Sequence, residues 1–240
     1  MSGILIYSEK EAKRNIFAIN KFKENLDIKL ADENYDGKAD FVINRTNNYM
    51  IAQKFEQKGI RVFNPSSLSM LANNKQLCYE FMYKNGIEIL PINYSEIPAV
   101  KKPIDGHGGQ NVTMINKKEK FEPGFVYQKP CATLGKDLRV WAIGGKIITA
   151  ILRESDFRSN FCLGGKAAPY ELNHDETALV KKVLSLIKSD YIGIDFLFDN
   201  GHLIFNEIED TVGARMVYDK TDIDIIKLYC NYIKKEVGTK

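Results

Sequence analysis

The first seventy residues alternate short apolar runs with segments of helical periodicity. The predicted strands are Ile4–Tyr7, Phe41–Ile43 and Arg61–Phe63, and the predicted helices are residues 9–26 and 48–58. Within the first helix, Ile16, Ile19 and Phe22 are spaced to share one face. Strands that alternate with helices indicate a small parallel α/β layer, which we assign to residues 1–70.

A second pattern follows in residues 71–125. A helix is predicted for residues 69–85, ended by Gly86. The prolines at positions 91, 98 and 103 then divide the chain into short strand-like pieces. We interpret residues 71–125 as a short central domain that carries a lid.

Beyond residue 125 the predicted strands become longer. They cover residues 125–129, 138–143, 146–152, 191–198 and 202–209. Gly144-Gly145 and Asn200-Gly201 are typical of hairpin turns. Helices are predicted for residues 173–188, capped by Asn173, and for 222–234. The pattern predicts a C-terminal antiparallel sheet domain, residues 126–240, and an α/β fold class overall.

Composition narrows the class of protein. The 240 residues are 44% hydrophobic and 27% charged, with a net charge of +3 and scattered lysines, so neither nucleic acid nor a membrane is expected as a partner. The four cysteines are widely spaced and contain no Cys-x-x-Cys pair, which argues against a zinc site. The apolar run near the N-terminus is too short for a signal peptide or membrane span. A reducing cytoplasm is the expected location.

The last predicted hairpin carries three acidic residues, Asp195, Glu207 and Glu209. Residues two apart on a strand share a face, so Glu207 and Glu209 lie on the same face of their strand. Asp195 lies on the face of its strand that points away from its apolar neighbours. With a three-residue turn at residues 199–201, Asp195 lies opposite Phe205 and diagonal to Glu207, and the carboxylates converge. A two-residue turn would separate them.

Converging carboxylates repel one another unless a cation lies among them. Hard oxygen ligands of this kind suit Mg²⁺, with Mn²⁺ able to replace it. The alternative is a solvent-facing sheet that simply carries acidic side chains.

Two other motifs could contact phosphate. Residues 101–109 read Lys-Lys-Pro-Ile-Asp-Gly-His-Gly-Gly, in which glycines let backbone amides approach a phosphate and a lysine adds charge. Arg158, Ser159 and Asn160 offer a guanidinium, a hydroxyl and an amide. Each motif also fits an ordinary turn, and neither is a P-loop.

The order of these motifs resembles the ATP-grasp superfamily, and within it the RimK-like carboxylate–amine ligases, over residues 73–218. The resemblance implies an ATP-grasp fold. The ATP-binding residues that it implies are Lys75, Lys102, Gly106, Gly108, Gly109, Gln128, Lys129, Pro130, Asp137, Arg158, Ser159 and Asn160. It implies that Asp195, Glu207 and Glu209 bind Mg²⁺ and that Arg158 is catalytic.

Two positions depart from the family pattern. Glu209 stands where the family usually has Asn, and Thr211 to Arg215 replace a Ser-Pro-Gly segment in the substrate region. The family's substrate is therefore not carried over. Arg139 and Arg215 are the candidate contacts for a substrate carboxylate.

The implied activity is ATP- and Mg²⁺-dependent conversion of a carboxylate to an acyl phosphate, which an amine then attacks, with release of ADP and phosphate. The expected substrates are small-molecule or peptide carboxylates and amines, and a homo-oligomer is compatible with the resemblance. Two alternatives remain: an ATP-grasp phosphotransferase, and a nucleotide-binding regulatory module without catalysis.

Overall fold

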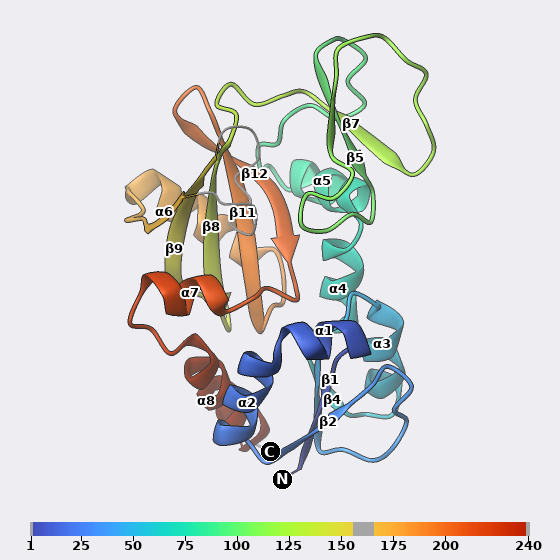
Figure 1. The fold of residues 1–240 in the computed structure, drawn as a ribbon, viewed down its shortest axis with the longest axis vertical. Coiled ribbons are helices and arrows are strands. Elements are labelled where there is room, and N and C mark those ends of the chain that lie inside the picture. The colour runs from blue at the N-terminus through green and yellow to red at the C-terminus, as the bar shows by residue number, and fades with distance from the viewer. Residues whose placement is uncertain (1, 156–165, 239–240) are drawn as a thin grey trace.

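The computed structural model describes residues 2–155 and 166–238 (Figure 1). These residues form helices and three separate sheets, of four, three and five strands in chain order. Within the described part of the chain no helix is long and apolar enough to cross a membrane. The predicted α/β class is confirmed, and the three sheets follow the three patterns of the sequence.

The four-stranded sheet is parallel and occupies the N-terminal layer. Its order is β2 (Ile28–Ala31), β1 (Gly3–Ile6), β3 (Phe41–Asn44), β4 (Arg61–Phe63). Strand β2 was not predicted, because its four residues lie at the sheet edge and only Ile28 is buried. The helix α3 (Tyr49–Gln57) begins at its N-cap Asn48, whose side chain accepts a hydrogen bond from the backbone of Met50.

The first predicted helix is two helices, α1 (Glu9–Arg14) and α2 (Ile16–Asn25). Asn15 separates them, and its side chain donates to the carbonyl of Glu11, which ends α1. Ile16, Ile19 and Phe22 all lie in α2, where Ile19 and Phe22 are buried and Ile16, the first residue of the helix, is 58% exposed.

The predicted helix 69–85 is also divided, into α4 (Ser66–Ala72) and α5 (Lys75–Lys84). The side chain of Asn74 accepts a hydrogen bond of 2.9 Å from the backbone of Leu77 and so caps α5. This cap places Lys75 in the first turn of α5, where its backbone N donates to Ile104 at 2.9 Å.

The central sheet is antiparallel and has the order β6 (Thr113–Ile115), β5 (Ala99–Pro103), β7 (Phe125–Gln128). The glycine loop, residues 104–112, connects β5 to β6, and Lys102 lies near the end of β5. In Figure 1 this sheet stands above α5. Because β7 pairs with β5, we propose that the central part extends to Gln128 rather than ending at residue 125.

The five-stranded sheet is antiparallel. Its order is β10 (Lys166–Pro169), β9 (Lys146–Glu154), β8 (Lys136–Ile143), β11 (Tyr191–Asp199), β12 (His202–Glu209). One face buries Ile194 and Phe196 against Val180 and Val183 of α6 (His174–Ser185), as the alternation along β11 predicts. The other face carries the polar side chains of Asp137, Arg139 and Asp195 together with the buried aromatic residues Trp141 and Tyr191.

The C-terminal helices connect this sheet to the N-terminal layer. They are α7 (Arg215–Lys220), which was not predicted, and α8 (Ile225–Gly238), which lies beside α2 (Figure 1). One buried cluster joins Leu5 and Phe22 of the first layer to Trp141, Tyr191 and Tyr229 of the C-terminal part. The shared core joins the parallel sheet to this second face of the large sheet.

Candidate active site

A cleft of about 1790 Å³ lies where the three sheets meet. The predicted site residues that line it are Lys75, Lys102, Gly106, Gly108, Gly109, Gln128, Lys129, Asp137, Arg139, Asp195, Glu207, Glu209 and Arg215. Pro130 follows Lys129 but does not line the cleft. Arg158, Ser159 and Asn160 lie outside the described residues. Residues far apart in the sequence are therefore gathered at one place.

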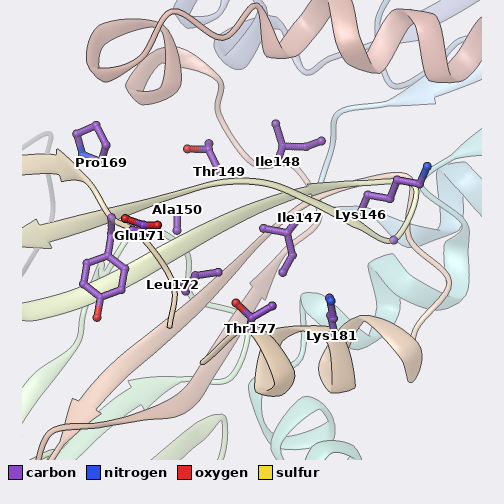
Figure 2. A pocket seen from close by; sticks show the side chains of 12 residues that line it. Lys146, Ile147, Ile148, Thr149, Ala150, Pro169, Glu171, Leu172, Thr177 and Lys181 are labelled. Carbon is purple, nitrogen blue, oxygen red and sulfur yellow. The ribbon is translucent and has the colours of Figure 1, made fainter. Parts of the chain in front are cut away.

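A second, open hollow of about 740 Å³ lies between β9, β10 and α6 (Figure 2). Apolar residues such as Ile147 and Leu172 line it, with Lys146, Lys181 and Glu171 among them. It contains none of the predicted site residues. The chemistry that the sequence predicts belongs to the larger cleft.

The hairpin of β11 and β12 brings the three carboxylates together, but in a register that the sequence did not predict. Its turn has two residues, since Asp199 pairs with His202, so the three-residue turn was wrong. A bulge between Asp195 and Phe196 then shifts the register, and Asp195 lies opposite Glu207. One carboxylate oxygen from each of Asp195, Glu207 and Glu209 lies within 4.8 Å of the other two.

Two arginines neutralise Asp195. Arg139 donates from Nε and Nη2 to its two oxygens at 2.6 Å each, and Arg153 Nη2 donates at 2.8 Å. Burial raises the pKa of Asp195, but the two guanidinium groups outweigh this effect and lower the pKa to about 2. Asp195 is therefore ionised across the physiological pH range.

The same arginines extend the network. Arg139 Nη2 also donates to Glu209 at 3.2 Å, and Arg153 donates to both oxygens of Asp137. Arg139, predicted as a substrate contact, is thus placed against two of the three acids. Arg153 was not predicted as a site residue. The feature that could have identified it is the antiparallel pairing of β8 with β9, which places Arg153 opposite Asp137.

Lys75 connects the glycine loop to the acidic cluster. Its Nζ lies 3.0 Å from Glu207 Oε2 and also donates to the carbonyl of Gly106. Gly108 and Gly109 have φ of 61° and 70°, a conformation that glycine adopts without strain. The side chain of Lys75 therefore links the backbone of the glycine loop, at Gly106, to the acidic cluster, at Glu207.

Lys102 is buried in the wall of the cleft. Its Nζ donates to Gln128 Oε1 at 2.7 Å, Asn206 Oδ1 at 3.0 Å and Tyr79 OH at 3.3 Å. Burial lowers the pKa of Lys102 to about 8. Asn206 and Tyr79 were missed as site residues. Asn206 occupies the bulge of β12, a position that strand alternation alone does not identify.

The donor set fits a divalent cation. Carboxylate oxygens are the hard ligands that Mg²⁺ prefers. Asp195 already accepts three hydrogen bonds, and a carboxylate offers about four acceptor sites. Glu207 and Glu209 therefore supply most of the acceptor capacity that remains for a metal.

Comparisons with known proteins support one family. The chain is 26% identical to protein MG011 of Mycoplasma genitalium, over 94% of this chain and 90% of that protein. It is 25% identical to a probable alpha-L-glutamate ligase of Maridesulfovibrio salexigens, over 77% of this chain and 71% of that protein.

Two solved structures share the fold. The ATP-grasp ligase PsnB, complexed with a minimal precursor, Mg and ADP, superposes with a TM-score of 0.72 at 13% identity, covering 98% of this chain and 97% of that one. The D-alanine–D-alanine ligase from Bacillus anthracis, complexed with ATP, gives 0.71 at 15% identity and covers 98% of both chains. A sequence-family model described as the RimK-like ATP-grasp domain matches residues 82–233, more than half of the chain. This chain is a member of the RimK-like ATP-grasp family.

Proposed function

We propose that this protein uses ATP and Mg²⁺ to convert a carboxylate to an acyl phosphate and then joins the acyl group to an amine, releasing ADP and phosphate. The observation that carries the proposal is the cluster of three carboxylates within 4.8 Å in the cleft that also contains Lys75 and Lys102. A binding module without catalysis has little need of such a cluster.

The proposed order of reaction follows from leaving-group chemistry. A carboxylate oxygen is a poor leaving group in amide formation and phosphate is a good one, so the carboxylate attacks the terminal phosphorus of ATP first. The amine nitrogen then attacks the acyl carbon, phosphate leaves, and the nitrogen loses a proton. Water would hydrolyse the acyl phosphate, which gives the glycine loop, residues 104–112, a reason to cover the cleft.

The acidic cluster and the two lysines receive separate roles. Asp195, Glu207 and Glu209 would hold Mg²⁺, which would supply positive charge beside the phosphates. Lys75 and Lys102 would contact the phosphates, because both residues line the same cleft. The resemblance assigns Arg158, with Ser159 and Asn160, to the phosphoryl group in transfer.

The remaining cleft residues position the nucleotide. Gln128, Lys129 and Pro130 are proposed to lie along the base. Asp137 is paired with Arg153, and its proposed contribution is to fix that arginine. The substrates are proposed to be amino acids or peptides, in a cytoplasmic protein.

The test is product analysis with ATP, Mg²⁺ and a panel of amino acids and short peptides. A ligase releases phosphate and ADP in proportion to the amine consumed. A phosphorylated product without free phosphate would instead indicate a phosphotransferase. ATP binding with no turnover of any panel member would contradict the proposal and favour a nucleotide-binding module.

A further inference from the structure

The glycine loop carries one of the three histidines of the chain, and it is the one that lines the cleft. His107 is half-buried there, between two glycines. His174 and His202 are exposed and do not line the cleft. Covering the cleft requires only the backbone of the loop, so an imidazole at this position calls for a separate explanation.

The backbone around His107 is held on both sides. Gln110 N donates to the carbonyl of His107 at 3.2 Å, which closes a turn. On the other side, Lys75 Nζ donates to the carbonyl of Gly106 and also pairs with Glu207. The residue before His107 is thus tied to the acidic cluster. This connection places the imidazole beside the site where the acyl phosphate is proposed to form.

The surroundings of His107 keep its imidazole neutral. Burial lowers the pKa of His107, and the ammonium of Lys75 on α5 lowers it further, against the opposing effects of Glu209 and Glu207 on β12 and of Asp105 on the loop. A histidine with a pKa below the ordinary value of about 6.5 is mostly uncharged at pH 7. Within residues 2–155 and 166–238 its ring nitrogens form no hydrogen bond or salt bridge. One ring nitrogen therefore has a lone pair that can accept a proton.

The proposed ligase reaction needs a group of this kind. An amine substrate is an ammonium ion at pH 7, and it has no lone pair for attack until it loses a proton. Other ionisable groups of the cleft are already engaged: Asp195 is bound by two guanidinium groups, and Lys102 donates three hydrogen bonds. Carboxylates are also weaker bases than an imidazole. His107 is the side chain best suited to accept the proton.

We propose that His107 is the catalytic base that removes a proton from the ammonium group of the amine substrate. This inference rests on the proposed ligase function. The ammonium proton passes to a ring nitrogen, the lone pair of the amine attacks the acyl carbon, and the bond from that carbon to the phosphate oxygen breaks. The nitrogen then loses a second proton, which leaves with the phosphate. The imidazolium returns its own proton to solvent.

The first experiment compares two acceptors in the wild-type protein and in His107→Gln. ATP, Mg²⁺ and a pool of common L-amino acids and short peptides are supplied at pH 7, and amide products are measured by mass spectrometry. Hydroxylamine is added to a parallel mixture, where it converts the acyl phosphate to a hydroxamate. Hydroxylamine is uncharged at pH 7, so it needs no base to expose its lone pair.

His107→Gln should lower amide formation about a hundredfold to ten-thousandfold, the usual contribution of a general base. Hydroxamate formation should stay close to that of the wild type, because the acyl phosphate still forms. A residue that only contacts ATP or only holds the loop would lower both products together. The ratio of the two products therefore isolates the proton transfer.

A second variant and a matched control complete the test. In His107→Ala, added imidazole should restore amide formation several-fold, because it can enter the vacated space and accept the proton. His174→Gln removes an exposed histidine of α6 outside the cleft and should change neither product. Calorimetric binding of ADP in the presence of Mg²⁺ shows that each variant is folded.

The outcomes separate this inference from the ligase function. Equal losses of amide and hydroxamate in folded His107→Gln, or undiminished amide formation, would overturn the role of His107 and leave the ligase function standing. Loss of amide alone, with rescue of His107→Ala by imidazole, would support it. A wild-type protein that forms neither product would contradict the ligase function, and the base would fall with it.

Discussion

The two ends of the cleft differ in how their charged side chains are paired. At the acidic end, cations and anions alternate from Asp137 through Arg153, Asp195 and Arg139 to Glu209. At the other end, Arg45 and Arg215 donate to backbone carbonyls, and within the described residues neither forms a salt bridge. One end is held together by salt bridges, and the other by hydrogen bonds from arginines to the backbone.

The difference indicates what each end does. A network of paired charges holds its side chains in fixed positions, which suits the binding of a metal and the transfer of a phosphoryl group. A cation without a salt bridge contributes less to stability but can give selectivity for anions. We therefore expect substitutions at the acidic end to affect turnover and folding, and substitutions at the other end to affect the choice of substrate.

The largest expected effect is at Glu207. Glu207→Gln should lower turnover by about a thousandfold, because it removes a metal ligand and the partner of Lys75. Phosphate release at saturating ATP and Mg²⁺ measures the loss. Glu24→Gln, on the exposed side of α2, controls for the change in charge. Turnover within tenfold of wild type in a folded Glu207→Gln variant would exclude Glu207 as an essential ligand.

A second prediction compares the stability of the two ends. Arg153→Met should lower the free energy of unfolding by about 3–5 kcal/mol, because it leaves Asp137 and Asp195 buried with fewer partners. Arg45→Met should lower it by only about 1–3 kcal/mol, since it leaves two carbonyls without a donor but breaks no salt bridge. Urea denaturation measures both, and an Arg45→Met variant less stable than Arg153→Met would contradict the comparison.

A third prediction concerns ATP affinity. Lys102→Ala should weaken ATP binding about ten- to hundredfold, the loss expected for one charge-assisted contact. Lys101→Ala is the matched control, because Lys101 faces Glu119 and Glu122 and does not line the cleft. Calorimetry at pH 7 measures both variants. Equal affinities in the two variants would remove Lys102 from the nucleotide site.

The pH dependence of binding tests the same lysine. Burial lowers the pKa of Lys102 to about 8, so its ammonium is charged below pH 8 and loses its charge as the pH rises past that value. ATP affinity should therefore fall between pH 7 and pH 9 in the wild type. In Lys102→Ala this fall should be much smaller. A fall of equal size in both proteins would assign it to another group.

Local patterns predicted most of the fold. Alternation along residues 191–198 gave the buried face of β11, and Asn173 gave the start of α6, where it forms a capping box with Glu176. The short edge strand β2 and the breaks at Asn15 and Asn73 were missed. Each depends on packing or on a single side-chain hydrogen bond, which periodicity does not record.

The candidate site was predicted unevenly for a related reason. Strand alternation identified the three acids, but the bulge that pairs Asp195 with Glu207 adds one residue that no period predicts. Arg153 and Asn206 acquire their partners only when β8, β9 and the central sheet are assembled. Arg45 follows a buried strand like many surface residues, and only the approach of Thr211 and Val212 reveals its position.

The smallest expected effect, and the one that probes the acidic end most finely, is at Glu209. Glu209→Asn keeps one oxygen ligand but removes a negative charge and weakens the bond from Arg139. The variant should stay active and need several-fold more Mg²⁺ for half-maximal turnover, a change of roughly 1 kcal/mol. Titrating Mg²⁺ at fixed ATP measures it. Because Arg139 would still bind Asp195 through two hydrogen bonds, maximal turnover should change little. Superimposable Mg²⁺ curves for the variant and the wild type would show that Glu209 does not bind the metal, and would leave the site to Asp195 and Glu207.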